Sequence, residues 1–110
     1  MLGEITMFNK WDIVYARMPY REDPSQSKTR PCVIVDVDYS SNEYLLIGIT
    51  SSTHNRESDW AVKYCRQANI SQGSVIMTDH IVRVKASANL TFAGRLDKYD
   101  KVNVMRLLKK

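Results

Sequence analysis

The chain contains few of the residues from which metal centres and disulfide frameworks are built. Only two histidines and two cysteines occur among its 110 residues, and neither pair has the close spacing of zinc ligands. Cys32 and Cys65 lie far apart, and Cys32 belongs to an apolar run typical of a core strand. We therefore expect two buried thiols rather than a disulfide. Any chemistry that the chain performs is expected to need no metal ion and no other cofactor.

Long apolar segments are also missing. No apolar run approaches the length of a bilayer-spanning helix, which predicts a protein without a membrane partner. The first residues have neither the basic start nor the apolar stretch of a secretory signal, so a cytoplasmic location is expected. No run of five or more like charges is present, which argues against a charged binding tail.

The composition fits one compact domain, and we expect residues 1–110 to form it. A hydrophobic content of 44% supplies a real core, and the chain is too short for two domains. Sixteen basic against twelve acidic residues give a formal charge of +4, with a pI near 9.2. This excess favours partners that carry phosphate groups or acidic side chains.

Runs of β-branched and aromatic residues predict a mainly β fold. The expected strands cover residues 12–18, 32–35, 45–49, 59–63, 74–77 and 81–84, the last two joined or separate. The second and third strands are expected to pair antiparallel through a turn at residues 39–42. A polar loop is expected over residues 20–30.

One helix is expected near the end of the chain, over residues 97–108, with Asp97 as its N-cap. This segment has no glycine or proline, and apolar residues recur at every third position: Leu96, Tyr99, Val102, Met105 and Leu108. We predict that this stripe packs on the core, the alternative being a docking surface. Short strands followed by one helix predict a small, strongly curved barrel that the helix closes at one end.

The candidate active-site residues stand where two predicted strands begin and end. Arg30 precedes the apolar run 32–35, and Thr50 and Ser51 follow the run 45–49. If the two strands pair antiparallel, the start of the first lies beside the end of the second. A guanidinium and hydroxyl groups then share one rim, a combination suited to a phosphate group. The alternative is a surface arginine and an ordinary serine-rich turn.

Four segments, in this order and at these intervals, resemble the MazF/PemK toxins of toxin–antitoxin systems: residues 11–15, 26–35, 49–51 and 73–80. The resemblance spans nearly the whole chain. It implies an SH3-like barrel that forms a homodimer and cuts single-stranded RNA as a ribosome-independent, sequence-specific mRNA interferase. It also implies a cognate antitoxin protein that holds the enzyme inactive.

Three positions depart from the usual pattern of that family. It commonly has glycine at the position of Trp11, an acidic residue at that of Ser25 and glutamine at that of His80. The departures leave Arg30 and Thr50 intact but put the proton-transferring group in question. Two alternatives to a nuclease stay open. One is a toxin that blocks a protein target, as the similarly folded gyrase poison CcdB does, and the other is a degenerate member that binds RNA without cutting it.

RNA cleavage without a metal uses the neighbouring 2′-hydroxyl as nucleophile and leaves a 2′,3′-cyclic phosphate and a 5′-hydroxyl. Arg30 is the predicted stabiliser of the negatively charged phosphorane, because its guanidinium keeps its charge. Thr50 and Ser51 are predicted to hold the non-bridging oxygens or to orient the 2′-hydroxyl.

Asp79 and His80 are the two candidates for the general base. Asp79 comes first because it matches an aspartate used in some members of the family, and His80 comes second because histidine titrates near neutral pH. Consecutive strand residues point to opposite faces, so only one of the two is expected to face the substrate. Otherwise Asp79 is a turn or cap carboxylate, and His80 is an ordinary rim histidine.

A groove for single-stranded RNA needs positive charge and aromatic surfaces for unstacked bases. The residues predicted to contact RNA are Gln26, Lys28, His54, Arg56 and His80. The segment around His54 and Arg56 has an alternative reading as a plain polar connector. A further candidate cation is Arg21, candidate base platforms are Tyr20 and Tyr39, and the aromatic residues expected in the core are Tyr15, Trp60 and Tyr99.

Overall fold

The computed structural model describes residues 8–51 and 56–109, and within them the fold consists of six strands and two helices. The strands are β1 (Asp12–Pro19), β2 (Ser27–Asp38), β3 (Glu43–Thr50), β4 (Asp59–Ala61), β5 (Val75–Lys85) and β6 (Thr91–Arg95). The helices are α1 (Cys65–Ala68) and α2 (Lys98–Leu108). The predicted mainly β fold with a helix near the end of the chain is confirmed.

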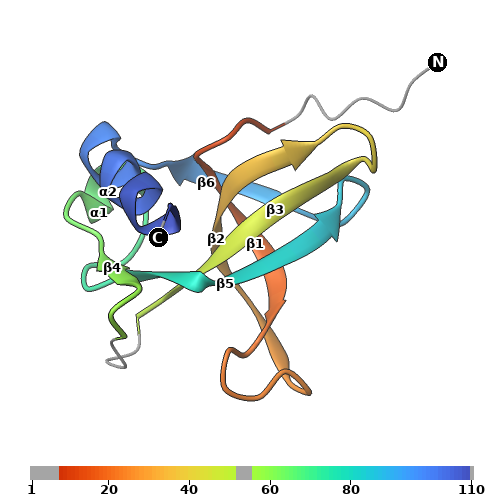
Figure 1. Ribbon diagram of the computed structural model, residues 1–110, viewed down its shortest axis with the longest axis horizontal. Helices are drawn as coiled ribbons and strands as arrows, with labels where there is room; N and C mark the ends of the chain where they lie inside the picture. The colour runs from red at the N-terminus through yellow and green to blue at the C-terminus, as the bar shows by residue number, and fades with distance from the viewer. Residues whose placement is uncertain (1–7, 52–55, 110) are drawn as a thin grey trace.

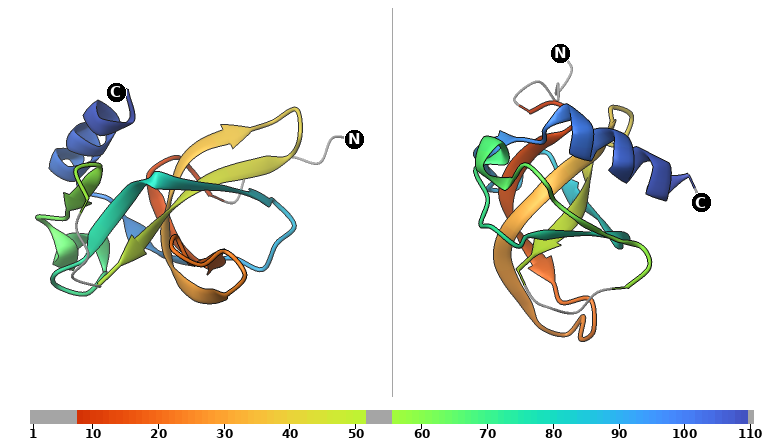
Figure 2. Two further views of the ribbon diagram at one scale, coloured as in Figure 1. Left: turned by 60° about the horizontal axis from the view of Figure 1, so that its bottom comes forward. Right: turned by 90° about the vertical axis from the view of Figure 1, so that its left-hand side faces the viewer.

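All six strands belong to one antiparallel sheet with the order β4-β5-β3-β2-β1-β6. The sheet coils strongly, and its strands run around the molecule as in a small SH3-like barrel (Figure 1 and Figure 2). The edge strands β4 and β6 do not pair with each other within the described residues, so the barrel is open there. Both helices lie together at one end of the sheet, where α1 contacts β6 and α2 contacts β5 (Figure 1). In the described part of the chain, neither helix has the length and apolar character needed to span a membrane.

Apolar side chains are buried on both faces of the sheet. One core cluster contains Ile13 and Val33 together with residues of both helices. The other contains the next residues along the same strands, Val14 and Ile34. Successive strand residues point to opposite faces, so a strand that is covered on both faces is apolar without alternation. The central strands therefore read as continuous apolar runs. Cys32 and Cys65 are buried free thiols, as predicted.

The β1–β2 connection is shorter than predicted. The expected loop at residues 20–30 is wrong because β2 begins at Ser27, which pairs with Pro19 at the end of β1. Backbone hydrogen bonds of this ladder hold polar residues in a strand that the side-chain pattern alone does not indicate. Only residues 20–26 form the loop, at the tip of the hairpin that projects at the bottom of Figure 1. Residues 75–85 form one strand.

The sequence did not predict α1 or β6. β6 contains Gly94, and glycine weakens a strand because it has no side chain to pack. A Cβ atom at this position would clash with the backbone carbonyl of Ala68 in α1. The close approach of α1 to β6 therefore requires this glycine, and only the tertiary structure reveals that requirement.

The helix α2 buries a different face from the one that the sequence predicted. Its buried residues are Asp100 and Val104, whereas Tyr99, Val102 and Met105 are 44%, 43% and 39% exposed. The predicted core stripe is wrong for these three residues, Tyr99 included. Its two ends are confirmed, since Leu96 is buried in the core and Leu108 packs against it. On a helix a step of three residues turns by about 300°, so a three-residue repeat drifts away from any one face.

Asp100 determines which face of α2 is buried. Its carboxylate accepts hydrogen bonds from the Trp60 indole Nε1 at 2.9 Å and from the backbone N atoms of Lys63 at 2.8 Å and Tyr64 at 3.0 Å. A fully buried carboxylate is tolerated when its oxygens have such partners. Asp100 thereby ties α2 to the segment between β4 and α1, and Trp60 packs against the core as predicted.

Replacing Asp100 with alanine should lower the free energy of unfolding by about 3 kcal/mol, because buried N–H donors lose their acceptor. Urea unfolding followed by circular dichroism measures the loss. Asp97 provides the control, since it is the predicted cap of the same helix and accepts a hydrogen bond from Tyr99 N at 2.9 Å. Asp97→Ala should cost about 1 kcal/mol. Equal losses in the two variants would contradict the role given to Asp100.

Candidate active site

Arg30, Thr50 and Ser51 line one pocket, whose volume is about 150 Å³. Arg30 comes from β2, Thr50 is the last residue of β3, and Ser51 follows it as an exposed residue. Lys28 lines the same pocket and brings a second positive charge. Cationic side chains and hydroxyls around a small cavity are the groups that bind a phosphate.

Strand pairing explains why Arg30 and Thr50 meet. β2 and β3 are antiparallel, with Cys32 opposite Gly48. Two residues further along, toward the start of β2 and the end of β3, Arg30 comes beside Thr50 on the same face of the sheet. The spacing of these residues in the sequence therefore predicts their proximity. Their chemical roles remain predictions.

The guanidinium of Arg30 packs on an aromatic ring from the β1–β2 loop. Its Cζ atom lies 5.5 Å from the centroid of the Tyr20 ring, a cation–π distance. Arg30 Nε is buried and has no hydrogen-bond partner in the part of the chain that the structure describes. Tyr20, predicted as a platform for RNA bases, thus contacts the arginine itself.

The cysteine nearest to Arg30 is chemically inert. The Cys32 thiol donates a hydrogen bond to the backbone oxygen of Arg30 at 3.3 Å. Burial raises the pKa of Cys32 to about 12, although the positive charge of Arg30 acts in the opposite direction. The thiol is therefore protonated at neutral pH and is no candidate nucleophile.

Asp79 and His80 lie outside the residues that line the Arg30 pocket. The Asp79 carboxylate accepts hydrogen bonds from Arg21 Nη1 at 2.8 Å and from Arg56 Nη1 at 3.0 Å. Partial burial raises the pKa of Asp79, but hydrogen bonds from the two arginines outweigh it, and the net pKa lies below the usual value. The carboxylate is accordingly a weak base.

His80 points to the other side of the strand from Asp79. Its Nε2 lies 2.8 Å from the backbone oxygen of Pro19, and because a carbonyl only accepts, Nε2 carries the proton. Its Cδ2 would lie 3.5 Å from a Cβ placed on Gly48. His80 is therefore on the same side of β3 as Thr50, two residues further along the strand.

Arg21 is the centre of a five-residue ion cluster, which we call the Arg21 cluster: Arg21, Glu22, Arg56, Asp59 and Asp79. Arg21 Nη1 donates to Asp59 Oδ1 at 2.7 Å and Nη2 to Oδ2 at 3.2 Å. The side chain of Arg21 is 5% exposed and that of Asp59 is 2% exposed. The hydrogen bond to Asp59 is the main reason that the pKa of Arg21 lies above its usual value. Arg21 is thus not a free cation for RNA.

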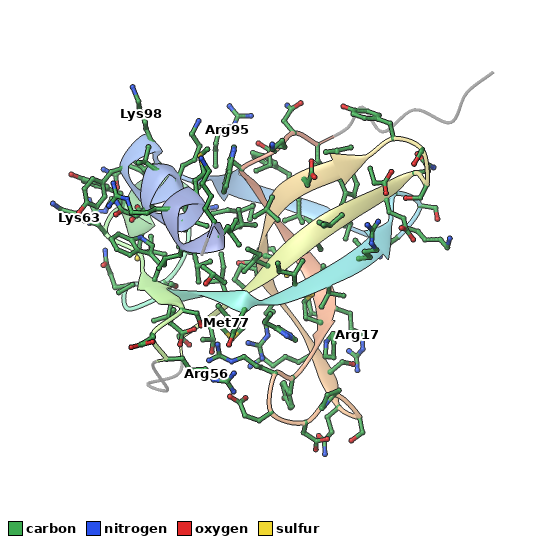
Figure 3. The ribbon with its side chains drawn as sticks, in the orientation of Figure 1. Arg17, Arg56, Lys63, Met77, Arg95 and Lys98 are labelled. Atoms are coloured by element: carbon green, nitrogen blue, oxygen red, sulfur yellow. The ribbon has the colours of Figure 1, made fainter. Side chains whose placement is uncertain are left out.

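Arg56, in the segment between β3 and β4, also belongs to the Arg21 cluster. Its Nη2 lies 3.2 Å from Glu22 Oε2, and its backbone N donates to Asp59 Oδ2 at 2.9 Å. Figure 3 shows Arg56 on the β4 side of the β1–β2 hairpin and Arg17 on the opposite side. Arg56 is 45% exposed as a side chain, so it keeps a surface that RNA can reach.

The other predicted RNA contacts fall in different places. Gln26 is exposed and closes the β1–β2 loop, where its backbone oxygen accepts from Tyr20 N at 2.9 Å. Lys28 is exposed at the pocket. His54 lies outside the described residues. Tyr39 is 71% exposed, but it stands in the β2–β3 turn, beyond the far end of β2 from Arg30, and does not line the pocket.

The sequence analysis did not predict two parts of the pocket lining. Tyr15 was predicted in the core, but it is 40% exposed and lines the pocket. The buried residues of β1 on either side of it are Val14 and Ala16, so Tyr15 and the polar Arg17 share the outward face. That alternation was the available signal. The other feature is the turn 71–74, whose Ser71 and Ser74 line the pocket and carry no pattern that indicates it.

Within residues 8–51 and 56–109 there is no group of three or more histidine, cysteine, aspartate and glutamate side chains arranged to hold a metal ion. The carboxylates of Asp59 and Asp79 are engaged by arginines. The donors that face the pocket are hydroxyls and cations, which are poor metal ligands and good phosphate ligands.

The family of PemK-like, MazF-like toxins of type II toxin–antitoxin systems matches residues 9–110. The chain belongs to this toxin family. Among solved structures, the toxin resembles MazF (Form-I) from Deinococcus radiodurans, with a TM-score of 0.70 at 12% identity and coverage of 94% of both chains. It also resembles MazE-MazF (Form-III) from Deinococcus radiodurans, with a TM-score of 0.69 at 10% identity and 94% of both chains covered.

A third similar structure is described as an endoribonuclease from Mycobacterial species. It has a TM-score of 0.66 at 11% identity, and the match covers 94% of the toxin and 91% of that chain. At such low identity these likenesses establish the fold. No curated protein sequence matches the toxin.

The backbone of the toxin explains one departure from the family pattern. Trp11 has a φ of 74°, in the left-handed region that glycine adopts without strain. The glycine common at this position in the family suits that conformation. In the toxin the tryptophan accepts the strained backbone and packs against the core cluster under the helices.

Proposed function

We propose that the toxin is a sequence-specific endoribonuclease that cuts single-stranded RNA without a metal ion. The observation that carries the proposal is that Arg30, Thr50, Ser51 and Lys28 all line the same pocket. Membership of the PemK-like, MazF-like toxins supports it, and so does the similar chain that is described as an endoribonuclease. The net charge of +4 favours a polyanionic substrate.

In this mechanism the 2′-hydroxyl of the RNA attacks the neighbouring phosphorus. The new O2′–P bond forms as the P–O5′ bond breaks, and the departing 5′-oxygen takes up one proton from water. The products are a 2′,3′-cyclic phosphate and a 5′-hydroxyl. Arg30 stabilises the extra negative charge on the non-bridging oxygens in the transition state. Thr50 and Ser51 donate hydrogen bonds to those oxygens or orient the 2′-hydroxyl, and Lys28 binds the phosphate chain.

For the proton of the 2′-hydroxyl, the geometry favours His80 over Asp79. The Asp79 carboxylate is held by two arginines, and its lowered pKa weakens it as a base. His80 lies on the Thr50 side of the sheet, and its proton on Nε2 is fixed by the Pro19 carbonyl. The neutral ring therefore has Nδ1 as its acceptor nitrogen, the form that a general base needs.

The pH dependence of cleavage tests this choice. A base works in its deprotonated form, so kcat/KM rises with pH through the pKa of the base and then levels off. With Asp79 as the base, its lowered pKa would place the rise below the usual range of a carboxylic acid, so the profile would be flat around neutral pH. We expect His80→Gln to remove the rise and Asp79→Asn to retain it. The reverse result would restore Asp79 as the base.

The function itself is tested with purified toxin and a long single-stranded RNA in the presence of a chelator. We expect cleavage to fragments that end in 2′,3′-cyclic phosphate. A substrate with one 2′-deoxy nucleotide at the cut site should stay intact there, and its scission would exclude the proposed nucleophile. Intact RNA together with arrested growth of cells that express the toxin would indicate a protein target.

We also propose that the toxin forms a homodimer and is neutralised by a cognate antitoxin. The family consists of toxins of type II toxin–antitoxin systems, and two of the similar structures are described as MazE-MazF. Light scattering of the purified toxin tests the dimer. Co-expression with the protein encoded beside it tests the antitoxin, whose addition should stop RNA cleavage.

A further inference from the structure

The β1–β2 loop connects Arg30 to the Arg21 cluster through two adjacent residues. The ring of Tyr20 lies 5.5 Å from Arg30 Cζ. The next residue, Arg21, contacts Asp59 on β4 and Asp79 on β5. In the sheet order three strands separate β4 from β1, so these contacts join parts of the sheet that are not paired with each other. The β1–β2 loop therefore contacts the candidate catalytic residue Arg30 through Tyr20, and it contacts β4 and β5 through Arg21.

The ion pair between Arg21 and Asp59 is bidentate and almost inaccessible to water. Arg21 and Asp59 form two parallel N–H···O hydrogen bonds, and both side chains are almost fully buried. Asp79 adds a third hydrogen bond, and Glu22 and Arg56 extend the cluster at the surface. Charged groups paired in this way cannot separate without leaving a buried charge unpaired. Arg21 therefore fixes the position of its neighbour Tyr20.

The loop is also braced internally. Tyr20 N donates to Gln26 O at 2.9 Å, and Gln26 N donates to Asp23 O at 3.0 Å. Ser25 Oγ donates to Asp23 Oδ1 at 2.6 Å. These bonds make residues 20–26 a compact unit, so a shift at Arg21 is transmitted to Tyr20.

Arg30 needs such support, because its side chain has many rotamers to lose on binding RNA. No hydrogen bond holds its Nε within the described residues, and the contact with the Tyr20 ring restricts the guanidinium instead. We propose that Tyr20 is a positioning residue that orients Arg30 for phosphorane stabilisation, and that the Arg21 cluster anchors Tyr20. The proposal rests on the proposed nuclease function of Arg30, and it gives Asp79 an anchoring role.

Single-turnover cleavage by Tyr20 variants tests the proposal. Tyr20→Leu removes the ring and should lower kcat about tenfold while KM changes by less than about twofold. Tyr20→Phe keeps the ring and should restore most of the rate. Phe92→Leu is the matched control, because it removes an exposed aromatic ring on β6 that does not line the pocket. Equal rates for Tyr20→Leu and Phe92→Leu, or failure of Tyr20→Phe to restore the rate, would overturn the role of Tyr20.

The variant Asp79→Asn tests whether the Arg21 cluster holds Tyr20 in place. It weakens one contact of Arg21 but leaves the buried pair with Asp59, so kcat should fall by a smaller factor than in Tyr20→Leu. Asp38→Asn is the control, since Asp38 accepts from Arg83 Nη1 at 3.0 Å in an ion cluster at the other end of β2. A loss on the order of a hundredfold or more in Asp79→Asn would mark Asp79 as the base and overturn the anchoring role.

A readout without RNA separates this proposal from the nuclease function. The Tyr20 ring should shield the Arg30 guanidinium, and the Nε–H signal of Arg30 in NMR spectra can be assigned by its loss in Arg30→Lys. We expect that signal to move in Tyr20→Leu and to stay in Tyr20→Phe and Phe92→Leu. A toxin that fails to cut RNA but shows this pattern retains the positioning contact. An unmoved signal in Tyr20→Leu overturns the contact whether or not RNA is cut.

Discussion

Arg30→Ala should lower kcat/KM for RNA cleavage by about a thousandfold or more, because the transition-state charge loses its main cationic partner. Arg30→Lys should recover only part of the rate, since an ammonium lacks the planar fork of donors that matches phosphate oxygens. Cleavage of a fluorescent RNA under single-turnover conditions in chelator measures both variants.

Arg83→Ala is the matched control for Arg30. Arg83 is 55% exposed and pairs with Asp38 and Glu43 at the far end of β2 and β3. Its removal changes the net charge by the same amount but leaves the pocket intact, so the cleavage rate should stay close to that of the unmodified toxin. An Arg30→Ala variant as active as Arg83→Ala would remove the basis of the proposed mechanism.

Arg21→Ala should lower the free energy of unfolding by about 4 kcal/mol, because it leaves the Asp59 carboxylate without its cationic partner in a site that is 2% exposed. The hydrogen bond from Arg56 N to Asp59 compensates only part of this loss. Urea unfolding monitored by tryptophan fluorescence measures it. Replacing both partners, as Arg21→Met with Asp59→Leu, should recover much of the stability, because no unpaired charge then remains.

The surface arginine Arg83 serves as the control here as well. It also contacts two carboxylates, at 3.0 Å and 3.1 Å, but it lies in solvent, where an ion pair contributes little. Arg83→Ala should therefore leave the free energy of unfolding nearly unchanged. If Arg21→Ala cost no more than Arg83→Ala, the Arg21 cluster would not be the anchor of the loop.

The two halves of the candidate site differ in how well the sequence predicts them. Arg30 and Thr50 stand near the ends of strands joined by a short turn, and antiparallel pairing alone brings such ends together. Asp79 was predicted as the base because it matches an aspartate used in some members of the family. Its partners Arg21 and Arg56 are distant in the chain, and no local pattern connects them with it.

The toxin keeps the family fold with very little sequence identity to the solved structures that it resembles. Burial on both faces of the sheet requires apolar residues in the central strands, and many combinations of such residues satisfy that requirement. Local departures are then tolerated where other contacts compensate. Trp11 is one example, since its indole packs on the core although its backbone conformation suits glycine.

By itself, the sequence determined the mainly β fold, the helix cap at Asp97, and the proximity of Arg30 and Thr50, because strand composition, caps and hairpin register act over short distances along the chain. Only the tertiary structure decided the buried face of α2 and the surroundings of Asp79. These depend on the coiling of the sheet, which brings β4 and β5 to the β1–β2 loop and gives Asp100 its buried hydrogen-bond partners. Contacts of that kind join segments with no periodic relation in the sequence.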